Sequence, residues 1–180
     1  LLGQYAFYCV CAYVLRISCR YFNFDLLAGM GNGGGALSLR QVSIWLIFLT
    51  PALLMAGMHF ETELQLGPIK LLRYRKRKRW IWEMGIFDLQ AVLGWLICVC
   101  LFWGNSSGVF MRDILCCAVL CVHLLFLISC VYFLRSRGIK AVYSIFWTLL
   151  FIGLGIYFLS GMAALRNFFP GIWGMYCYSR

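Results

Sequence analysis

One stretch of the chain limits its fold more than any other: the segment from Ile114 to Leu134 contains no Asp, Glu, Lys or Arg. A helix rises about 1.5 Å per residue, so a segment of this length crosses the roughly 30 Å hydrocarbon core of a bilayer. In lipid, an isolated extended segment would leave its backbone N–H and C=O groups without partners, whereas a helix satisfies them internally. The segment is therefore typical of a transmembrane helix.

The composition of the whole chain supports this interpretation. Of its 180 residues, 63% are hydrophobic and only 12% are charged, and the mean hydropathy is +0.85. Soluble proteins carry about 25% charged residues, so a surface this poor in charge is not suited to water. The sequence predicts an all-α, polytopic integral membrane protein whose residues 1–180 form a single helical bundle.

Five apolar segments predict the membrane-spanning helices of this bundle. The first is close to the minimum length for a span, so we expect five transmembrane helices, or four if that segment lies in the membrane interface. The predicted spans are residues 1–17, 42–58, 86–103, 114–134 and 142–165.

The second predicted span contains a proline in its middle, Pro51. Proline has no N–H group, so the Ile47 carbonyl loses its helical donor and a kink is expected here. A group of acidic and helix-breaking residues further on predicts that the helix ends before residue 70: Glu61, Glu63, Gly67 and Pro68.

The segment 70–79 concentrates positive charge between the second and third spans, because it holds seven of the sixteen Lys and Arg residues of the chain. Such a segment stays in water, on the side where basic residues accumulate, which is the cytoplasm or the equivalent matrix or stromal side. The same side of the membrane then also holds Arg135, Arg137 and Lys140. This topology puts ten basic residues on that side and six on the opposite side. The seven residues are Lys70, Arg73, Arg75, Lys76, Arg77, Lys78 and Arg79.

Local concentration of the charge indicates what this segment binds. Basic residues at a membrane surface attract anionic lipid headgroups, at about 1 kcal/mol for each Lys or Arg. Trp80, Trp82 and Trp103 lie at the ends of the third span, where indole rings anchor a helix at the headgroup level. We therefore expect a bilayer with anionic lipids as the partner, and we do not expect a nucleic acid.

The two histidines, His59 and His123, raise the alternative of a haem protein. Their positions along the second and fourth spans differ in depth by roughly 12–15 Å, so a single haem iron cannot take both. Ligation by one of them together with a partner subunit stays open as an alternative. We expect His123 to form a hydrogen bond across a helix interface.

The cysteines give little indication of a metal site. Cys116, His123 and Cys130 share one helix face, but each step of seven residues spans about 10.5 Å, far more than the 2.0–2.3 Å of zinc–ligand bonds. We therefore expect no metal and no cofactor. Cys98 and Cys100 lie near the depth of Cys116 and Cys117, which leaves thiol redox chemistry or one structural disulfide as alternatives.

No combination of side chains in the sequence predicts catalysis, so an enzyme is not expected. Ala52 and Ala56 offer a small-residue packing face, and Asp88 is expected to pair with the basic segment or with a helix end. We predict a non-catalytic structural or accessory subunit of a larger membrane complex, which packs against partner helices. A small transporter or channel component is the main alternative, since Pro51 and the glycines of the last span permit movement, and a membrane redox protein is the other.

Overall fold

The computed structural model describes residues 2–21, 38–73, 77–103 and 110–159, and within them the side chains outside 2, 67–73, 77, 103, 110–116 and 159. All regular structure in these ranges is α-helical, which confirms the predicted all-α fold. The helices are α1 (Leu2–Tyr21), α2 (Leu39–Arg73), α3 (Arg77–Trp103), α4 (Phe110–Ser136) and α5 (Ala141–Leu159).

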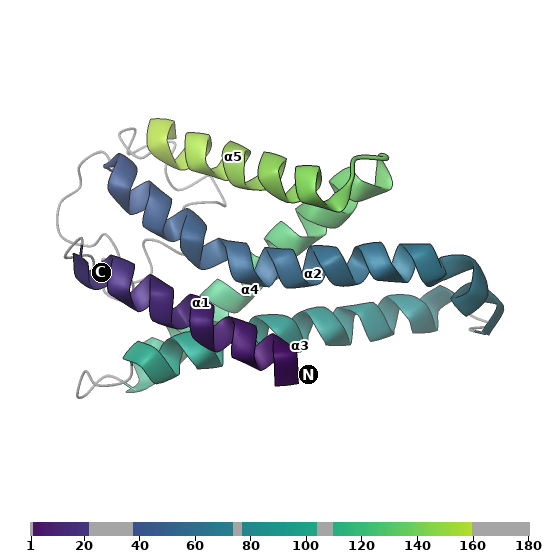
Figure 1. Cartoon of the computed structure of the whole chain (residues 1–180), viewed down its shortest axis with the longest axis horizontal. Helices are drawn as coiled ribbons and strands as arrows, with labels where there is room; N and C mark the ends of the chain where they lie inside the picture. The colour runs from purple at the N-terminus through teal and green to yellow at the C-terminus, as the bar shows by residue number, and fades with distance from the viewer. Residues whose placement is uncertain (1, 22–37, 74–76, 104–109, 160–180) are drawn as a thin grey trace.

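Helix α2 is the centre of the bundle, because it packs against each of the other four helices. α3 also contacts α1 and α4, and α4 contacts α5. Successive helices from α2 to α5 run in opposite directions, so the connections α2–α3 and α4–α5 lie at one end of the bundle (right in Figure 1). The C-terminal end of α2 and the N-terminal end of α3 extend beyond the other helices on this side (Figure 1).

Four of the five helices are long and apolar enough to cross a membrane, as expected for an integral membrane protein. The stretches that qualify are Leu39–Leu66, Lys78–Phe102, Cys117–Ser136 and Ala141–Phe158. Helix α1 is not among them, and it lies against α3 and α2. Residues 160–165, the end of the last predicted span, lie outside the described part of the chain.

The start of α2 is fixed by a capping box. The Ser38 backbone N–H donates to Gln41 Oε1 at 2.9 Å, and the Gln41 N–H donates to Ser38 Oγ at 3.4 Å. This exchange satisfies two donors that a helix N-terminus otherwise leaves without partners. The helix consequently begins at Leu39, a turn earlier than the predicted span.

The expected end of this helix before residue 70 is wrong, because α2 continues as one helix to Arg73. Its two acidic residues do not stop it, since each is matched by a group from another helix: Arg135 of α4 pairs with Glu61, and Trp80 of α3 donates to Glu63. At about 1.5 Å per residue, this 35-residue helix is longer than a bilayer core is thick.

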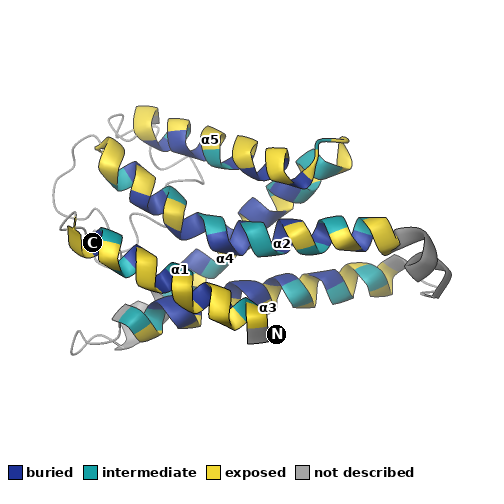
Figure 2. Cartoon of the chain, in the orientation of Figure 1, coloured by how far each residue is buried: buried dark blue, intermediate teal, exposed yellow. Residues whose placement is uncertain are grey.

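The core of the bundle lies along the middle of α2, where Figure 2 shows buried residues facing the neighbouring helices and exposed residues facing outward. Trp95 of α3 is fully buried there, and its Nε1–H donates to the Phe48 carbonyl at 3.0 Å. Pro51 is also buried, and α2 changes direction partway along its length (Figure 1). A proline within a helix favours such a bend.

Candidate functional site

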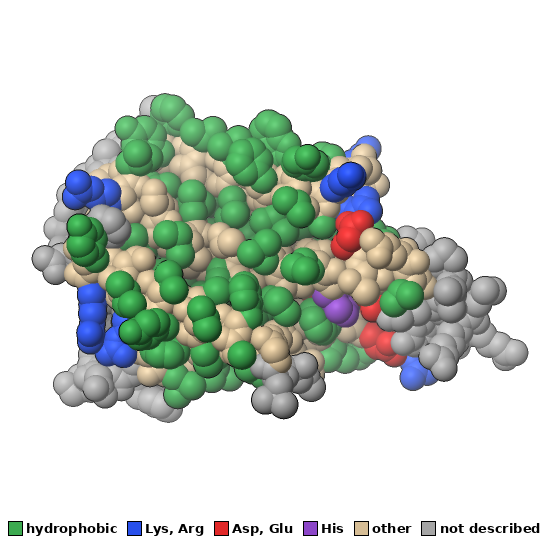
Figure 3. Space-filling model, in the orientation of Figure 1, with side chains coloured by type: hydrophobic (Ala, Val, Ile, Leu, Met, Phe, Trp, Pro, Cys, Tyr) green, Lys and Arg blue, Asp and Glu red, His purple; other side chains and the backbone are tan. Residues whose placement is uncertain are grey.

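The acidic side chains described in the spans lie toward the end of the bundle where α2 meets α3 and α4. Figure 3 shows acidic side chains and a histidine toward this end, on a surface that is otherwise mostly apolar between basic side chains at the two ends. We call this set the polar cluster. Its members are His59, Glu61, Glu63, Trp80, Asp88, Tyr132 and Arg135.

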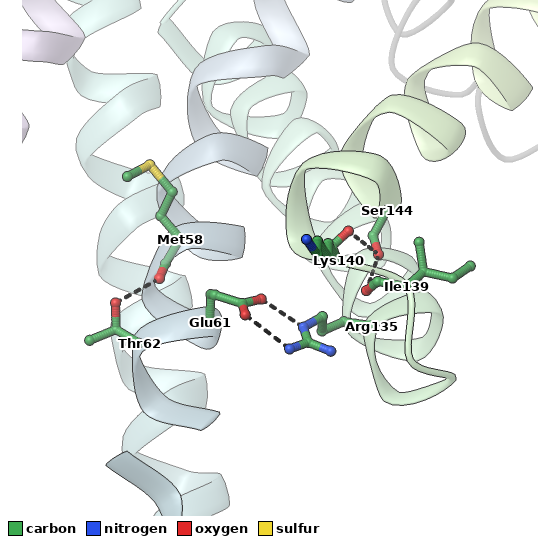
Figure 4. Close-up of polar contacts among 7 residues, drawn as sticks. All are labelled: Met58, Glu61, Thr62, Arg135, Ile139, Lys140 and Ser144. Atoms are coloured by element: carbon green, nitrogen blue, oxygen red, sulfur yellow. Dashed lines mark hydrogen bonds and ion pairs between the residues drawn. The ribbon is translucent and has the colours of Figure 1, made fainter. Parts of the chain in front are cut away.

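The strongest interaction of the polar cluster is the ion pair between Glu61 and Arg135, which joins α2 to α4. Arg135 Nε donates to Glu61 Oε2 at 2.6 Å, and Nη2 donates to Oε1 at 2.9 Å. Figure 4 shows the two planar groups facing each other beside the start of α5, where Ser144 donates to the carbonyls of Ile139 and Lys140. Two parallel hydrogen bonds fix both the separation and the rotation of the groups.

A second polar contact joins α4 to α3 deeper in the bundle. Tyr132 Oη donates to Asp88 Oδ1 at 2.5 Å. The Ala56 carbonyl oxygen of α2 lies 3.5 Å from the same tyrosine hydroxyl. Asp88 is only 6% exposed, and the Tyr132 ring stacks on Phe60 with 4.1 Å between ring centroids. A buried carboxylate needs such a donor, because leaving it without one costs a large part of its hydration energy. The hydroxyl, with a second acceptor in reach, can serve either one.

The third contact of the polar cluster joins α2 to the beginning of α3. Trp80 Nε1–H donates to Glu63 Oε2 at 3.4 Å, and His59 Nε2 lies 3.7 Å from Glu63 Oε1. The His59 ring stacks on Phe87 with 3.5 Å between centroids and 12° between planes. Through this set, the nearly buried Glu63 and the partly exposed His59 are linked to the beginning of α3.

The predicted lipid-binding segment is divided between two helices. Lys70 and Arg73 belong to the last turn of α2, and Arg77 opens α3, but their side chains lie outside the described ones, as do Arg75 and Lys76 as a whole. Lys78 and Arg79 are described, and both are exposed. Arg79 pairs with Glu83 at 3.3 Å, with side chains 74% and 42% exposed. Headgroup binding by these residues stays a prediction.

The remaining predicted residues lie apart from one another. Trp82 is 69% exposed, as a headgroup anchor requires, whereas Trp80 is half-buried against Glu63. The side chain of Trp103 is not described. His123 is buried in α4 beside Trp45 of α2, with 6.4 Å between ring centroids. Anchoring by these tryptophans and a hydrogen bond from His123 across the interface stay predictions.

The polar cluster itself was not predicted from the sequence, because its members come from three different helices. The available signal was depth: Glu61, Asp88 and Arg135 all lie toward the ends of spans that reach the basic side. Opposite charges at one depth on neighbouring helices are candidates for pairing. Among the described residues, no three His, Cys, Asp or Glu side chains come together as a metal site would need.

The comparisons with known proteins found no match, so the function is inferred from the sequence and the structure. No protein-family model matches the chain, no curated protein matches it, and no solved structure matches it. The fold nevertheless defines the class, which is that of all-α, helical integral membrane proteins.

Proposed function

We propose that this chain is a non-catalytic subunit of a larger membrane assembly, which contributes helix packing and lipid contacts. The observation that carries the proposal is the small share of each span that the chain buries by itself. In the apolar 18-residue stretch of each of the four helices, between 33% and 56% is buried inside the bundle, and α4 and α5 are the least covered. Much of the span surface is therefore available to lipid or to neighbouring protein.

The outer face of α5 favours a protein neighbour over lipid alone. It carries large aromatic side chains along its whole length, whereas aromatic residues that serve only as lipid anchors concentrate at the two interfaces. Aromatic residues are also enriched in protein interfaces, because they bury a large area at low entropic cost. The exposed aromatic residues of this face are Tyr143, Phe146, Trp147, Phe151, Tyr157 and Phe158.

The polar cluster supports a structural role as well. Glu61 pairs with Arg135, and Asp88 accepts from Tyr132, so the strongest polar groups of the spans are engaged with each other across helix interfaces. Interactions of this kind fix the depth and rotation of neighbouring helices. A rigid bundle with apolar outer faces is suited to assembly with partner helices.

Anionic lipid is the second partner that we propose, bound by the basic segment 70–79. Lys78 and Arg79 are exposed at the start of α3, within one helical turn of the exposed Trp82. Native mass spectrometry of the protein with bound anionic and zwitterionic lipids tests this part. Replacing both residues by Gln should reduce retention of the anionic lipid several-fold and leave the zwitterionic lipid unchanged, and equal loss of the two lipids would contradict the assignment.

The subunit proposal is tested by isolating the chain from its own membrane in a mild detergent and measuring the mass of the particle. A mass well above that of one chain and its detergent, lost when Phe146 and Phe151 are both changed to Ala, supports the proposal. The matched control is Val10→Ala on α1, which removes an exposed apolar side chain elsewhere and should leave the mass unchanged. If the native protein and the double variant both gave a particle with one chain, the proposal would be contradicted.

Buried Asp88 favours one alternative, a small transporter or channel component. Ionisable residues within a span often mark a path for ions or protons, and Asp88 is nearly fully buried. Reconstitution of the single chain in liposomes tests this function. Flux that is lost in Asp88→Asn would establish the transporter, whereas the absence of flux in the isolated chain is expected for an accessory subunit.

A further inference from the structure

Two cysteines from different helices lie in contact toward the end of the bundle opposite the polar cluster. Cys100 is near the end of α3 and Cys117 is in the first half of α4, and their sulfur atoms are 3.7 Å apart. Both side chains are half-buried. This separation is van der Waals contact, and a disulfide bond needs the two sulfur atoms to approach to about 2.0 Å. Rotation of the two side chains can supply part of this movement.

The same two sulfur atoms are reached from outside the bundle through an apolar groove of about 840 Å³ between α3 and α4. Its walls consist almost entirely of aliphatic side chains, including Leu93, Ile97 and Val122, with a third cysteine, Cys121. Leu93, Ile97 and Val122 are 44%, 58% and 66% exposed, so we infer that the groove faces the hydrocarbon and admits a molecule dissolved in it. A charged reagent in water does not enter such a groove at comparable rates.

We propose that Cys100 and Cys117 form a reversible disulfide site, which a lipid-soluble disulfide oxidises through the groove between α3 and α4. In the first step, one of the two protein sulfurs, as its thiolate, attacks the reagent. A protein–reagent S–S bond forms, the S–S bond of the reagent breaks, and one reagent thiolate leaves and takes up a proton. The proposal is independent of the subunit function.

In the second step, the other protein thiol attacks the protein sulfur of the mixed disulfide and expels the second reagent thiol. The Cys100–Cys117 bond has formed, two protein thiols have been oxidised, and one reagent disulfide has been reduced to two thiols that carry the two protons. The reverse exchange with an apolar thiol restores the starting state. The bond ties α3 to α4 across the groove.

The neighbouring cysteines differ from this pair in position. Cys121 lines the same groove one turn further along α4, so it is exposed to the same reagent and serves as the matched control. Cys98 is buried on α3 and interacts with Cys9 of α1, on another side of the helix. A disulfide specific to residues 100 and 117 therefore follows from geometry and not from access alone.

The test treats the full chain in lipid vesicles with 2,2′-dipyridyl disulfide, blocks the remaining thiols, and identifies joined peptides by mass spectrometry after trypsin. Cleavage after Arg79, Arg112 and Arg135 places Cys100 in peptide 80–112 and Cys117 in peptide 113–135, so a bond between the helices joins two peptides. Fragmentation of the joined pair then identifies the two cysteines. The unmodified chain is the main sample, so the result does not depend on the folding of a variant.

We expect peptides 80–112 and 113–135 to be joined through Cys100 and Cys117 in the native chain and in Cys121→Ser. In Cys100→Ser the joined pair should fall at least tenfold, while Cys117 carries one pyridyl group. The joined pair should also separate when an apolar thiol is added. A pyridyl group on each of the two cysteines with no joined peptide, or a bond that involves Cys98 or Cys121 instead, would overturn the proposal.

Discussion

The indole N–H of Trp95 donates to the Phe48 carbonyl at 3.0 Å, three residues before Pro51. The bond crosses from α3 to the part of α2 in which the proline interrupts the helical hydrogen bonds, and it lies in the fully buried core. Trp45 and Phe48 stack there with 5.0 Å between ring centroids. The two helices are consequently joined by both apolar packing and a directed bond at the bend.

Changing Trp95 to Phe removes this donor and part of the buried ring. We expect the free energy of unfolding to fall by about 2–4 kcal/mol, from the lost hydrogen bond and the space that the smaller ring leaves. Reversible unfolding of the purified protein by SDS in mixed micelles measures it. The control is Trp82→Phe, at an exposed position, which should change stability by less than about 0.5 kcal/mol. Equal effects of the two substitutions would contradict this assignment.

Gly57 allows α2 and α5 to approach closely. A Cβ atom at position 57 would lie 2.8 Å from Ile145 Cδ1, so the isoleucine must move. Because Ile145 is itself buried, at 5% exposed, its movement disturbs the core, and we expect Gly57→Ala to destabilise the protein by about 1–2 kcal/mol. Gly85→Ala is the control, since nothing lies within 4 Å of its Cβ, and it should stabilise α3 by about 0.5–1 kcal/mol. The same unfolding titration measures both, and a stabilising Gly57→Ala would show that the helices are not in contact here.

The Glu61–Arg135 pair offers a test of the polar cluster by a double-mutant cycle. Glu61→Gln and Arg135→Gln, alone and together, should give a coupling energy of about 1–2 kcal/mol, because the pair is bidentate and partly shielded from water. The exposed Arg79–Glu83 pair provides the matched cycle, for which we expect about 0.3–0.5 kcal/mol. Raising the salt concentration should reduce the second coupling more than the first. A first coupling no larger than the second would mean that the ion pair does not join α2 to α4.

Tyr132 holds Asp88 through one hydroxyl group. Tyr132→Phe keeps the ring that stacks on Phe60 and removes only the donor, so we expect a loss of about 1–3 kcal/mol of unfolding free energy from the unsatisfied carboxylate. Adding Asp88→Asn should recover part of this loss, because the neutral amide costs less to bury. The exposed Tyr143 provides the control substitution to Phe. An unchanged stability of Tyr132→Phe would remove Asp88 from the set of groups that hold the bundle together.

The sequence predicts the all-α class and four helices long and apolar enough to cross a membrane, because the length of an uncharged run decides whether a helix can do so. It does not predict how far a helix continues into water. The extension of α2 to Arg73 depends on partners from other helices, such as Trp80 on Glu63. It also does not predict which faces meet, since Asp88 and Tyr132 are 44 residues apart. Their contact depends on the relative rotation of α3 and α4, which no local pattern encodes.

The orientation of the bundle is tested by the accessibility of helix ends. Arg79 lies in the first turn of α3, and Arg137 lies in the turn after α4, where Gly138 adopts a φ of +91° that glycine accommodates. Ser38 precedes α2 at the other end. Cysteines placed singly at positions 79 and 137, in a chain whose ten native cysteines are replaced, should react with an impermeant maleimide from the same side of sealed vesicles. A cysteine at position 38 should react from the opposite side.

Basic residues determine this orientation, so the side of positions 79 and 137 should be the cytoplasmic or equivalent one. Labelling of positions 38 and 79 from one side would mean that α2 does not cross the membrane, and the depths of Glu61 and Asp88 would then no longer support either proposed function.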